Sequence, residues 1–339
     1  QQARLNWQAL TLHFANPFRV AYGASVTRQA FWLRLDEDAG WGEGTIPPYY
    51  GVETRTMAAF WQKASARRDD FPDDPAAVSR WVGDEGPAPA RAALDLALHD
   101  RIGRLTGRPL YDVLSLPKPK PLTTSYTVGI DTPQNMARLA RQVADFPLIK
   151  VKLGGDDDLL CLDAIKEARP DARLCVDANA AWSTQEALAM SKLLAGDDLE
   201  FIEQPVARDN FEGLALVQAA SAVPIVADES LQTVQDLERL AADGIQGINL
   251  KLMKVGGLAP AVGLVRRAKD LGLRVMLGCM IETSLGVTAV AHLSGLADWL
   301  DLDAPLLIAN DPFEGIQYDK HAQIYVPDRP GIGVRLRSE

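Results

Sequence analysis

From about residue 120 onward, short apolar runs alternate with longer stretches whose apolar residues recur at helical spacing. The helical stretches include DLLCLDAIKEAR, TVQDLERLAA and APAVGLVRRAKDLG. Strand-like runs start roughly every 25 residues, near Leu122, Leu148, Arg173, Phe201, Pro224, Gly247, Arg274 and Trp299. Eight strands that alternate with helices at this period predict a (β/α) barrel. The alternative is an open doubly wound sheet, which usually has a glycine-rich turn after its first strand, and TTSYTVGIDTP contains none.

The region before this alternation has a different pattern. The runs WQALTLHF and AFWLRLD precede two helical stretches near 53–68 and 86–105. Strands followed by helices predict an α+β domain over residues 1–115. The segment SLPKPKPL, with three prolines in eight residues, is typical of a linker. We expect the barrel over 120–309, and we expect the strand-rich tail, 310–339, to return to the first domain.

Bulk properties exclude several classes of protein. The net charge is −10, and no basic stripe with interleaved aromatic residues predicts a nucleic-acid surface. Because no apolar run has the length of a membrane span and the first residues lack the pattern of a signal peptide, we expect no membrane partner and a cytoplasmic enzyme. The three cysteines form no C-x-x-C pair, so neither a zinc site nor a disulfide framework is indicated.

Three acidic residues end three successive apolar runs: Asp177 in LCVDAN, Glu203 in FIEQP and Asp228 in IVADES. They lie roughly 25 residues apart, the length of a strand-helix-strand unit. Because barrel strands end at one rim, the three carboxylates are expected to converge there. Oxygen-only ligands suit Mg²⁺, with Mn²⁺ as the alternative. The alternative is a purely structural role in which all three residues cap helices, although glutamate is poorly suited to that role.

Lysines flank this predicted metal site. Lys150 and Lys152 lie two positions apart in IKVKLGG and therefore share one face of the second strand. Lys251 follows the sixth strand, across the ring, although nearby Lys254 competes for its role. Lysines on two sides of a substrate are suited to remove a proton from one face of a carbon and return one to the other. A cation on the substrate's carboxylate would stabilise the enediolate and lower the lysine pKa.

Five short motifs in order resemble the enolase superfamily, specifically its muconate-lactonising subgroup: KVK (150–152), DAN (177–179), EQP (203–205), ADES (227–230) and NLK (249–251). The resemblance covers almost the whole chain. It implies an α/β fold, a modified TIM barrel of the (β/α)7β type with an α+β capping domain formed by the N-terminal region and the C-terminal tail. It also implies the following roles: Mg²⁺ binding by Asp177, Glu203 and Asp228, acid/base catalysis by Lys152 and Lys251, and assistance to Lys152 by Lys150. We expect Asn179 and Glu229 to orient these groups.

Two aspartates narrow the reaction. Asp301 and Asp303, in WLDLDAP, resemble the Asp-x-Asp motif with which dipeptide epimerases hold the substrate's α-ammonium. Two carboxylates on one face would favour a cation there. The alternative is a purely structural role in which the two aspartates cap a short loop. Glu282, in GCMIETSLG, lies in a segment similar to the seventh strand of these epimerases and either lines the pocket or caps the next helix.

The side chains of the substrate are less well indicated. L-Ala-D/L-Glu epimerases carry an arginine in the loop after the first strands, and alignment on Pro17-Phe18 puts Gly23 at that position. Arg19 and Arg28 are near in sequence, but the sequence does not place either on the site. We expect NPFRVAYGASVTRQ and IPPYYGVE (46–53) to cover the site and set side-chain preference.

The predicted function is a Mg²⁺-dependent dipeptide epimerase that inverts the α-carbon of the C-terminal residue by two-base proton transfer. Its partner is a small dipeptide substrate, and the sequence leaves the oligomeric state open, a homo-oligomer included. The alternatives are other reactions of the subgroup: N-acylamino acid racemisation, o-succinylbenzoate synthesis and muconate cycloisomerisation. A non-catalytic metal-binding scaffold is the alternative from a different class.

Overall fold

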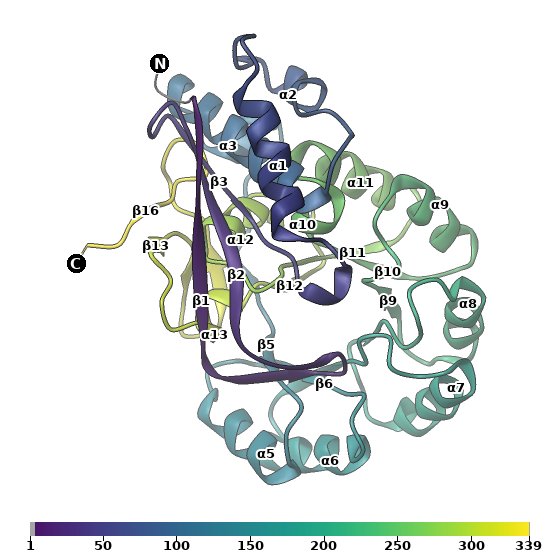
Figure 1. The fold of residues 1–339 in the computed structure, drawn as a ribbon. Helices are drawn as coiled ribbons and strands as arrows, with labels where there is room; N and C mark the ends of the chain where they lie inside the picture. Colours follow the sequence, from purple (N-terminus) through teal and green to yellow (C-terminus); the bar gives the residue numbers. More distant parts are fainter. Residues whose placement is uncertain (1–3, 339) are drawn as a thin grey trace.

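An eight-stranded parallel sheet curls into a barrel in the computed structural model of the chain, which describes residues 4–338 (Figure 1). A parallel bridge between Thr124 and Leu300 joins the last strand to the segment before the first. The strands follow chain order around the ring: β5 (Tyr126–Val128), β6 (Leu148–Lys152), β7 (Arg173–Asp177), β8 (Ile202–Glu203), β9 (Ile225–Ala227), β10 (Gly247–Leu250), β11 (Arg274–Gly278) and β12 (Trp299–Asp301). The predicted α/β barrel is confirmed.

Helices cover the outside of the barrel between successive strands. Several begin where the sequence supplies a side-chain cap: Ser183 and Glu186 form a capping box, as do Thr233 and Asp236. The covering helices are α5 (Pro133–Gln142), α6 (Asp158–Ala168), α7 (Thr184–Leu193), α8 (Phe211–Ala220), α9 (Val234–Ala242), α11 (Leu258–Asp270) and α12 (Ser284–Ala291), with the short α10 (Leu252–Val255) and α13 (Ala304–Leu307) after β10 and β12.

The strands place apolar and polar side chains in separate layers inside the ring. One buried cluster, which includes Cys175, Phe201 and Val226, comes from positions two residues before Asp177, Glu203 and Asp228. Residues i and i+2 of a strand point to the same side. The apolar layer therefore fills the barrel beneath the acidic residues, which lie at the carboxyl ends of the strands. Cys175 packs there as a small apolar residue.

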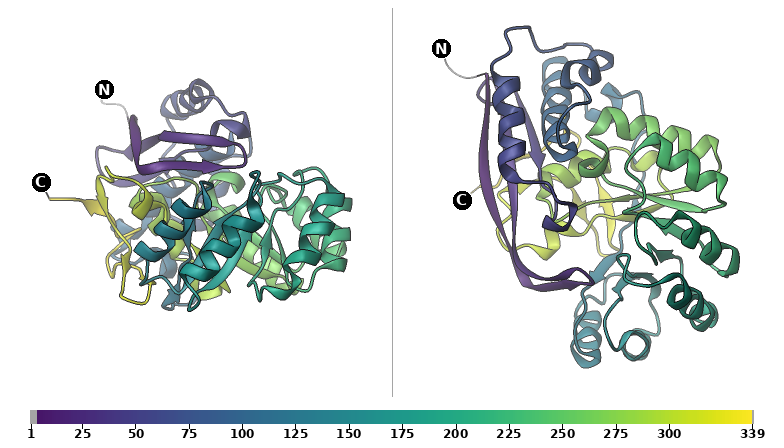
Figure 2. Two further views of the ribbon diagram at one scale, coloured as in Figure 1. Left: turned by 90° about the horizontal axis from the view of Figure 1, so that it is seen from below. Right: turned by 45° about the vertical axis from the view of Figure 1, so that its right-hand side comes forward.

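The N-terminal region forms an antiparallel sheet and helices against the barrel. Its sheet consists of β1 (Leu5–Val20), β2 (Gly23–Leu35) and β3 (Gly40–Gly44), and it lies as a separate layer over the barrel in the left-hand view of Figure 2. Its helices are α1 (Thr54–Ser65), α2 (Pro75–Val82), α3 (Ala88–Thr106) and α4 (Leu110–Val113). The stretches predicted near 53–68 and 86–105 correspond to α1 and α3. Sequence reasoning missed α2, a helix of 8 residues that Asp74 caps.

The C-terminal tail contacts the N-terminal region and also pairs with the segment before the barrel. The ring of Phe313 packs edge-on against Trp32, with 5.1 Å between the ring centroids, and Asp100 accepts a hydrogen bond from the backbone N–H of Ile332. The tail strands are β13 (Phe313–Glu314), β14 (Gln317–Tyr318), β15 (Gln323–Tyr325) and β16 (Arg335–Leu336).

The run at Leu122 was expected to open the barrel, but β4 (Leu122–Thr123) pairs with β15 instead. The barrel strand starts at Tyr126. The domain boundaries at 115 and 310 stay predictions. Among residues 4–338, no helix is both long and apolar enough to cross a membrane.

Candidate active site

Three buried carboxylates converge at the rim of the barrel. Asp177 ends β7, Glu203 ends β8, and Asp228 directly follows β9. Each offers an oxygen atom, and these atoms lie within 4.8 Å of one another. Because the three residues are at most 1% exposed, capping exposed helix ends does not account for them. An oxygen-only set at this spacing fits a hard divalent cation such as Mg²⁺.

Four lysines surround the acidic triad. The Nζ atom of Lys150 lies 2.6 Å from Glu203 Oε2 and 2.6 Å from Asp301 Oδ2. Lys152 contacts Asp177 at 2.7 Å and donates a hydrogen bond to Asn179 Oδ1. On the far side, Asp228 is held at 2.6 Å by Lys251 and at 2.8 Å by Lys254. The strand order leaves three strands on either side between β6 and β10, so Lys152 and Lys251 lie on opposite sides of the ring.

At Lys150, Lys251 and Asp228 the ion pairs outweigh the cost of burying a charge. Burial alone would lower the pKa of Lys150, but Asp301 and Glu203 outweigh it and raise that pKa well above its usual range. The pKa of Lys251 is raised in the same way, mainly by Asp228. For Asp228 itself, burial opposes ionisation, but Lys251 and Lys254 hold its pKa well below the ordinary value.

Sequence reasoning treated Lys254 only as a competitor of Lys251. In the structure Lys254 is a separate brace, because its ammonium donates to the backbone carbonyls of Asp228 and Asn249 as well as pairing with the Asp228 carboxylate. Burial lowers the pKa of Lys254. A signal was available: Lys254 lies three residues after Lys251, which is one helical turn in α10.

A second missed residue braces the acidic triad from within the EQP motif. Gln204 accepts hydrogen bonds from the backbone N–H groups of Asp228 and Ser230 and donates to Val206 and Ser230. Its φ of 35°, like the 43° of Asn179, lies in the left-handed region that non-glycine residues rarely occupy. Such strain, one residue after Glu203 and two residues after Asp177, is typical of a functional site.

The two aspartates at the end of β12, Asp301 within it and Asp303 just after it, lie beside Lys150 and the first barrel strand. Asp301 accepts a hydrogen bond from the Ser125 hydroxyl in addition to its pairing with Lys150. Asp303 accepts a hydrogen bond of 2.6 Å from the backbone N–H of Thr127. Burial, together with the Asp301 charge, raises the pKa of Asp303 to about 7. The pair therefore has a carboxylate that a positively charged group would help to ionise.

Asn179 and Glu229, predicted to orient other groups, both have partners at the site. Asn179 accepts from Lys152, and Glu229 accepts a hydrogen bond of 2.8 Å from the hydroxyl of Tyr22, at the tip of the β1–β2 hairpin. Burial and the neighbouring Asp228 raise the pKa of Glu229 well above its usual range. The Tyr22 contact links the hairpin to the barrel rim, and the sequence carried no signal for it.

Three of the lysines and the aspartate pair line a pocket beneath residues of the N-terminal region. Its roof includes Phe18, Val20 and Arg28 from the hairpin and Pro47 and Tyr49 from the following segment. Its floor and walls include Thr127, Lys150, Lys152, Asn179, Lys251, Cys279, Met280, Asp301 and Asp303. Both segments predicted to cover the site therefore contribute to it.

Two predicted substrate-binding residues, Gly23 and Glu282, are not among the described residues that line this pocket. Gly23 lines an adjacent hollow with Tyr22, Arg28 and Tyr49. Glu282 is buried and accepts a hydrogen bond from the backbone N–H of Met280. Burial and the neighbouring Glu43 raise the pKa of Glu282 well above its usual range. The predicted roles of Gly23 and Glu282 in substrate binding stay untested.

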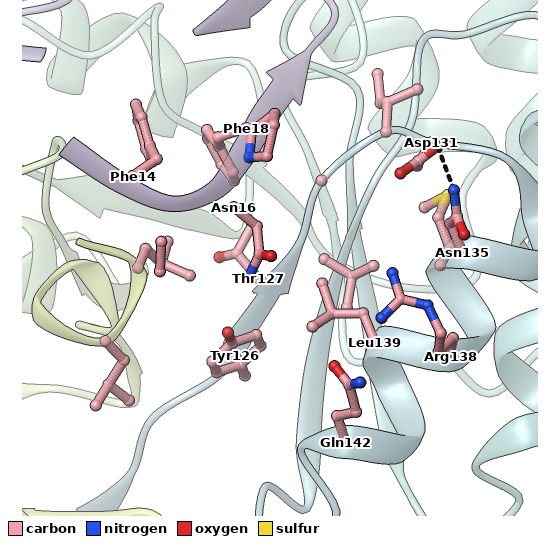
Figure 3. A pocket seen from close by; sticks show the side chains of 18 residues that line it. Phe14, Asn16, Phe18, Tyr126, Thr127, Asp131, Asn135, Arg138, Leu139 and Gln142 are labelled. Carbon is pink, nitrogen blue, oxygen red and sulfur yellow. Dashed lines mark hydrogen bonds between the residues drawn. The ribbon is translucent and has the colours of Figure 1, made fainter. Parts of the chain in front are cut away.

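Another hollow adjoins the pocket between the hairpin and α5 (Figure 3). Phe18 and Thr127 line both cavities. Figure 3 shows Arg138 and Gln142 on α5 facing this hollow from the side opposite Phe14. It contains none of the acidic triad or its lysines, so it lies beside the predicted chemistry and not at it.

Comparison with known proteins agrees with this geometry. Residues 135–339 match the family described as enolase C-terminal domain-like. The L-Ala-D/L-Glu epimerase of Bacteroides thetaiotaomicron is 38% identical over 329 residues, which cover 95% of this chain and 85% of that protein. The chain belongs to the enolase superfamily.

Solved structures extend the likeness over the whole fold. The dipeptide epimerase of Cytophaga hutchinsonii, complexed with Mg and the dipeptide D-Ala-L-Val, has a TM-score of 0.92 at 30% identity, covering 99% of this chain and 96% of its own. A substrate-liganded L-Ala-D/L-Glu epimerase from Bacillus subtilis has a TM-score of 0.90 at 30% identity, covering 98% of both chains. These relatives confirm the resemblance on which the sequence interpretation relied, and with it the prediction of an isomerase acting on amino acid derivatives.

Proposed function

We propose that the chain is a Mg²⁺-dependent dipeptide epimerase that inverts the α-carbon of the C-terminal residue. The observation that carries the proposal is the position of Lys152 and Lys251, which lie on opposite sides of the ring, each paired with a residue of the acidic triad. Relatives named as dipeptide epimerases support the substrate class. Asp177, Glu203 and Asp228 would hold the metal ion.

A bound Mg²⁺ supplies positive charge, which stabilises the negative charge that develops on the substrate's carboxylate and lowers the pKa of nearby lysines. The remaining work belongs to side chains of this protein. One of Lys152 and Lys251 takes the α-proton as a neutral amine, and the other, as an ammonium, returns a proton to the opposite face. The configuration inverts because the two nitrogen atoms approach from opposite sides.

Lys150 has a different role from the two acid/base lysines. It is 2% exposed and contacts Glu203, Asp301 and, at 3.3 Å, Asp177. A cation so placed balances the surplus of carboxylates around the substrate. The same face of β6 carries Lys152, which we expect Lys150 to assist as a base.

Asp301 and Asp303 would receive the substrate's N-terminal ammonium. They are 6% and 3% exposed, so an ion pair formed there is only weakly screened by water. Lys150 already pairs with Asp301, whereas Asp303 has backbone and hydroxyl partners but no lysine within ion-pair distance in the described chain. Asp303 would therefore gain more than Asp301 from pairing with a positively charged group.

Proton exchange in D₂O tests the function directly. A set of L-Ala-X dipeptides is incubated with the Mg²⁺-loaded protein and analysed by mass spectrometry and chiral chromatography. We expect one deuterium in the C-terminal residue and the appearance of its D-epimer. N-succinylamino acids and muconate serve as competing substrates. Turnover of those compounds without any exchange in dipeptides would replace the proposed reaction by another of the subgroup, and no exchange in any compound would favour a scaffold protein.

A further inference from the structure

Arg28 is a buried cation without a counter-ion in the roof of the active-site pocket. It lies on β2, opposite Leu12 of β1, and is 9% exposed. Its Nε atom has no hydrogen-bond partner, and no carboxylate among residues 4–338 pairs with its guanidinium. The other buried cations of the site differ, since Lys150, Lys251 and Lys254 all contact carboxylates. An unpaired buried guanidinium is costly, and a ligand group that pairs with it recovers that cost.

The proposed reaction assigns a binding position to three of the four substituents of the substrate's α-carbon. The carboxylate goes to the acidic triad, the hydrogen lies toward Lys152 or Lys251, and the peptide nitrogen leads toward Asp301 and Asp303. The remaining substituent is the side chain of the C-terminal residue. Two boundaries of the pocket remain: the segment after β11, with Cys279, Met280 and Ile281, and the roof, where Arg28 lies among Phe18, Val20, Pro47 and Tyr49. Of the two, the roof is the one that offers a charged side chain.

The roof around Arg28 favours a charged contact over a solvated one. Val20 is 9% exposed, and the ring of Tyr49 stacks on Tyr22 with 3.9 Å between the ring centroids. Arg28 itself is largely shielded from water, and burial lowers its pKa. In such surroundings a carboxylate that accepts two parallel N–H groups forms a strong and directional pair.

We propose that Arg28 receives the carboxylate of an acidic side chain on the substrate's C-terminal residue, so that the enzyme prefers dipeptides ending in glutamate or aspartate. The inference rests on the proposed function. It departs from the sequence comparison, in which the position used by L-Ala-D/L-Glu epimerases is Gly23, which has no side chain to offer. Here β2 supplies an arginine five residues later in the chain.

Two other arginines near the site are weaker receivers. Arg19, on β1, is exposed. Arg138 is also exposed and lines the neighbouring hollow, not the pocket with the lysines (Figure 3). An exposed guanidinium is already hydrated and gains little from a carboxylate. Arg138 therefore provides a matched control for a change of charge near the site.

The test compares L-Ala-L-Glu with its near-isosteric neutral analogue L-Ala-L-Gln, using kcat/KM for epimerisation. Wild-type protein should favour the glutamate dipeptide by about 10- to 150-fold, the value of a hydrogen-bonded charge. In Arg28→Met this ratio should fall close to one while the glutamine dipeptide still turns over, and Arg28→Lys should give an intermediate ratio. Arg138→Met should keep the wild-type ratio.

The outcomes separate this inference from the function on which it rests. If wild-type protein epimerises both dipeptides without preference, or if Arg28→Met keeps the preference, Arg28 is not the receiver and the epimerase assignment stands. If no dipeptide exchanges its α-proton, both proposals fall. If Arg28→Met folds poorly, the milder variant Arg28→Lys decides the inference, because an unchanged wild-type ratio in that variant would contradict it.

Discussion

The Nζ atom of Lys152 lies 2.7 Å from Oδ2 of Asp177, its register partner on the next strand. Across the ring the pattern repeats, since Lys251 lies 2.6 Å from Asp228 Oδ2. Each proposed base is thus paired with a carboxylate of the predicted metal site. The pairing holds both ammonium groups at the rim and couples the charge state of the lysines to whatever the carboxylates bind.

Removing either lysine should abolish epimerisation but leave a one-sided exchange reaction. In Lys152→Ala and Lys251→Ala, we expect epimerisation of dipeptides to fall by at least about 100-fold, because a general acid or base contributes roughly that much. Each variant should still exchange the α-proton of the epimer that faces the remaining lysine, measured by deuterium uptake. Lys192→Ala, an exposed lysine on α7, is the control. Full epimerisation by either active-site variant would contradict the two-base mechanism.

Asp303→Asn should weaken substrates that carry a free N-terminal ammonium. Because Asp303 lacks a lysine partner, the substrate's ammonium would be its main cationic partner. Loss of the Asp303 charge should therefore lower kcat/KM for a free dipeptide by about 10- to 150-fold. The N-acetylated dipeptide has no ammonium and should lose much less, so the ratio of the two rates is the measurement. An equal loss for both substrates would indicate a structural role for Asp303 through its hydrogen bond to Thr127.

Chelation should remove activity without unfolding the protein. The acidic triad is already neutralised in part by Lys150, Lys152, Lys251 and Lys254, so the carboxylates do not depend on a metal ion for charge balance. Adding Mg²⁺ at one hundred times its dissociation constant should stabilise the fold by about 2.7 kcal/mol, measured as a rise in Tm. The rise should disappear in Asp177→Asn. An unchanged rise in that variant would place the cation elsewhere.

His292 should make the protein less stable in acid. It is fully buried, with its ring nitrogens facing the backbone N–H of Tyr111 and the carbonyl of Ile332, and burial lowers its pKa from 6.5 to about 4. Between these values the unfolded state binds the extra proton, so this contribution to stability is present above pH 6.5 and is lost as pH falls toward 4. The loss is about 3 kcal/mol at its limit.

The measurement is the free energy of unfolding against pH for wild-type protein and His292→Gln. The variant should lack that part of the slope between pH 6.5 and 4, whatever its stability at neutral pH. His321→Gln alters an exposed histidine and should keep the wild-type slope. Parallel curves of unfolding free energy against pH for wild-type protein and His292→Gln would show that His292 does not cause the loss of stability in acid.

Glycines at two positions should respond to alanine in opposite directions. A Cβ atom at Gly42 of β3 would lie 1.9 Å from the carbonyl oxygen of Ala93, so Gly42→Ala must separate β3 from α3. We expect a loss of about 3 kcal/mol or more, as for overpacking in a core. Gly263, within α11, has no atom near its Cβ position, and Gly263→Ala should stabilise by about 0.5–1 kcal/mol. Denaturant unfolding measures both, and a mild effect at Gly42 would contradict the close packing of β3 on α3.

Much of the site was visible in the chain because it depends on short-range rules. The period of strands and helices predicts the barrel, and a position at the end of a parallel strand places a side chain at the rim. For that reason Asp177, Glu203 and Asp228 could be grouped before any contact was known. The alternation of strand residues also put Lys150 and Lys152 on one face.

Other features depended on packing between distant segments. The sequence alone determined the barrel, its acidic triad and the flanking lysines, because each follows from local periodicity. The tertiary structure decided that β4 pairs with the tail, that Tyr22 reaches Glu229 and that Arg28, not Gly23, lines the pocket with the lysines. These contacts join residues far apart in the chain. The positions of Tyr22 and Arg28 depend on how the N-terminal sheet docks on the barrel, and the pairing of β4 depends on how the tail folds back, relations that no local pattern encodes.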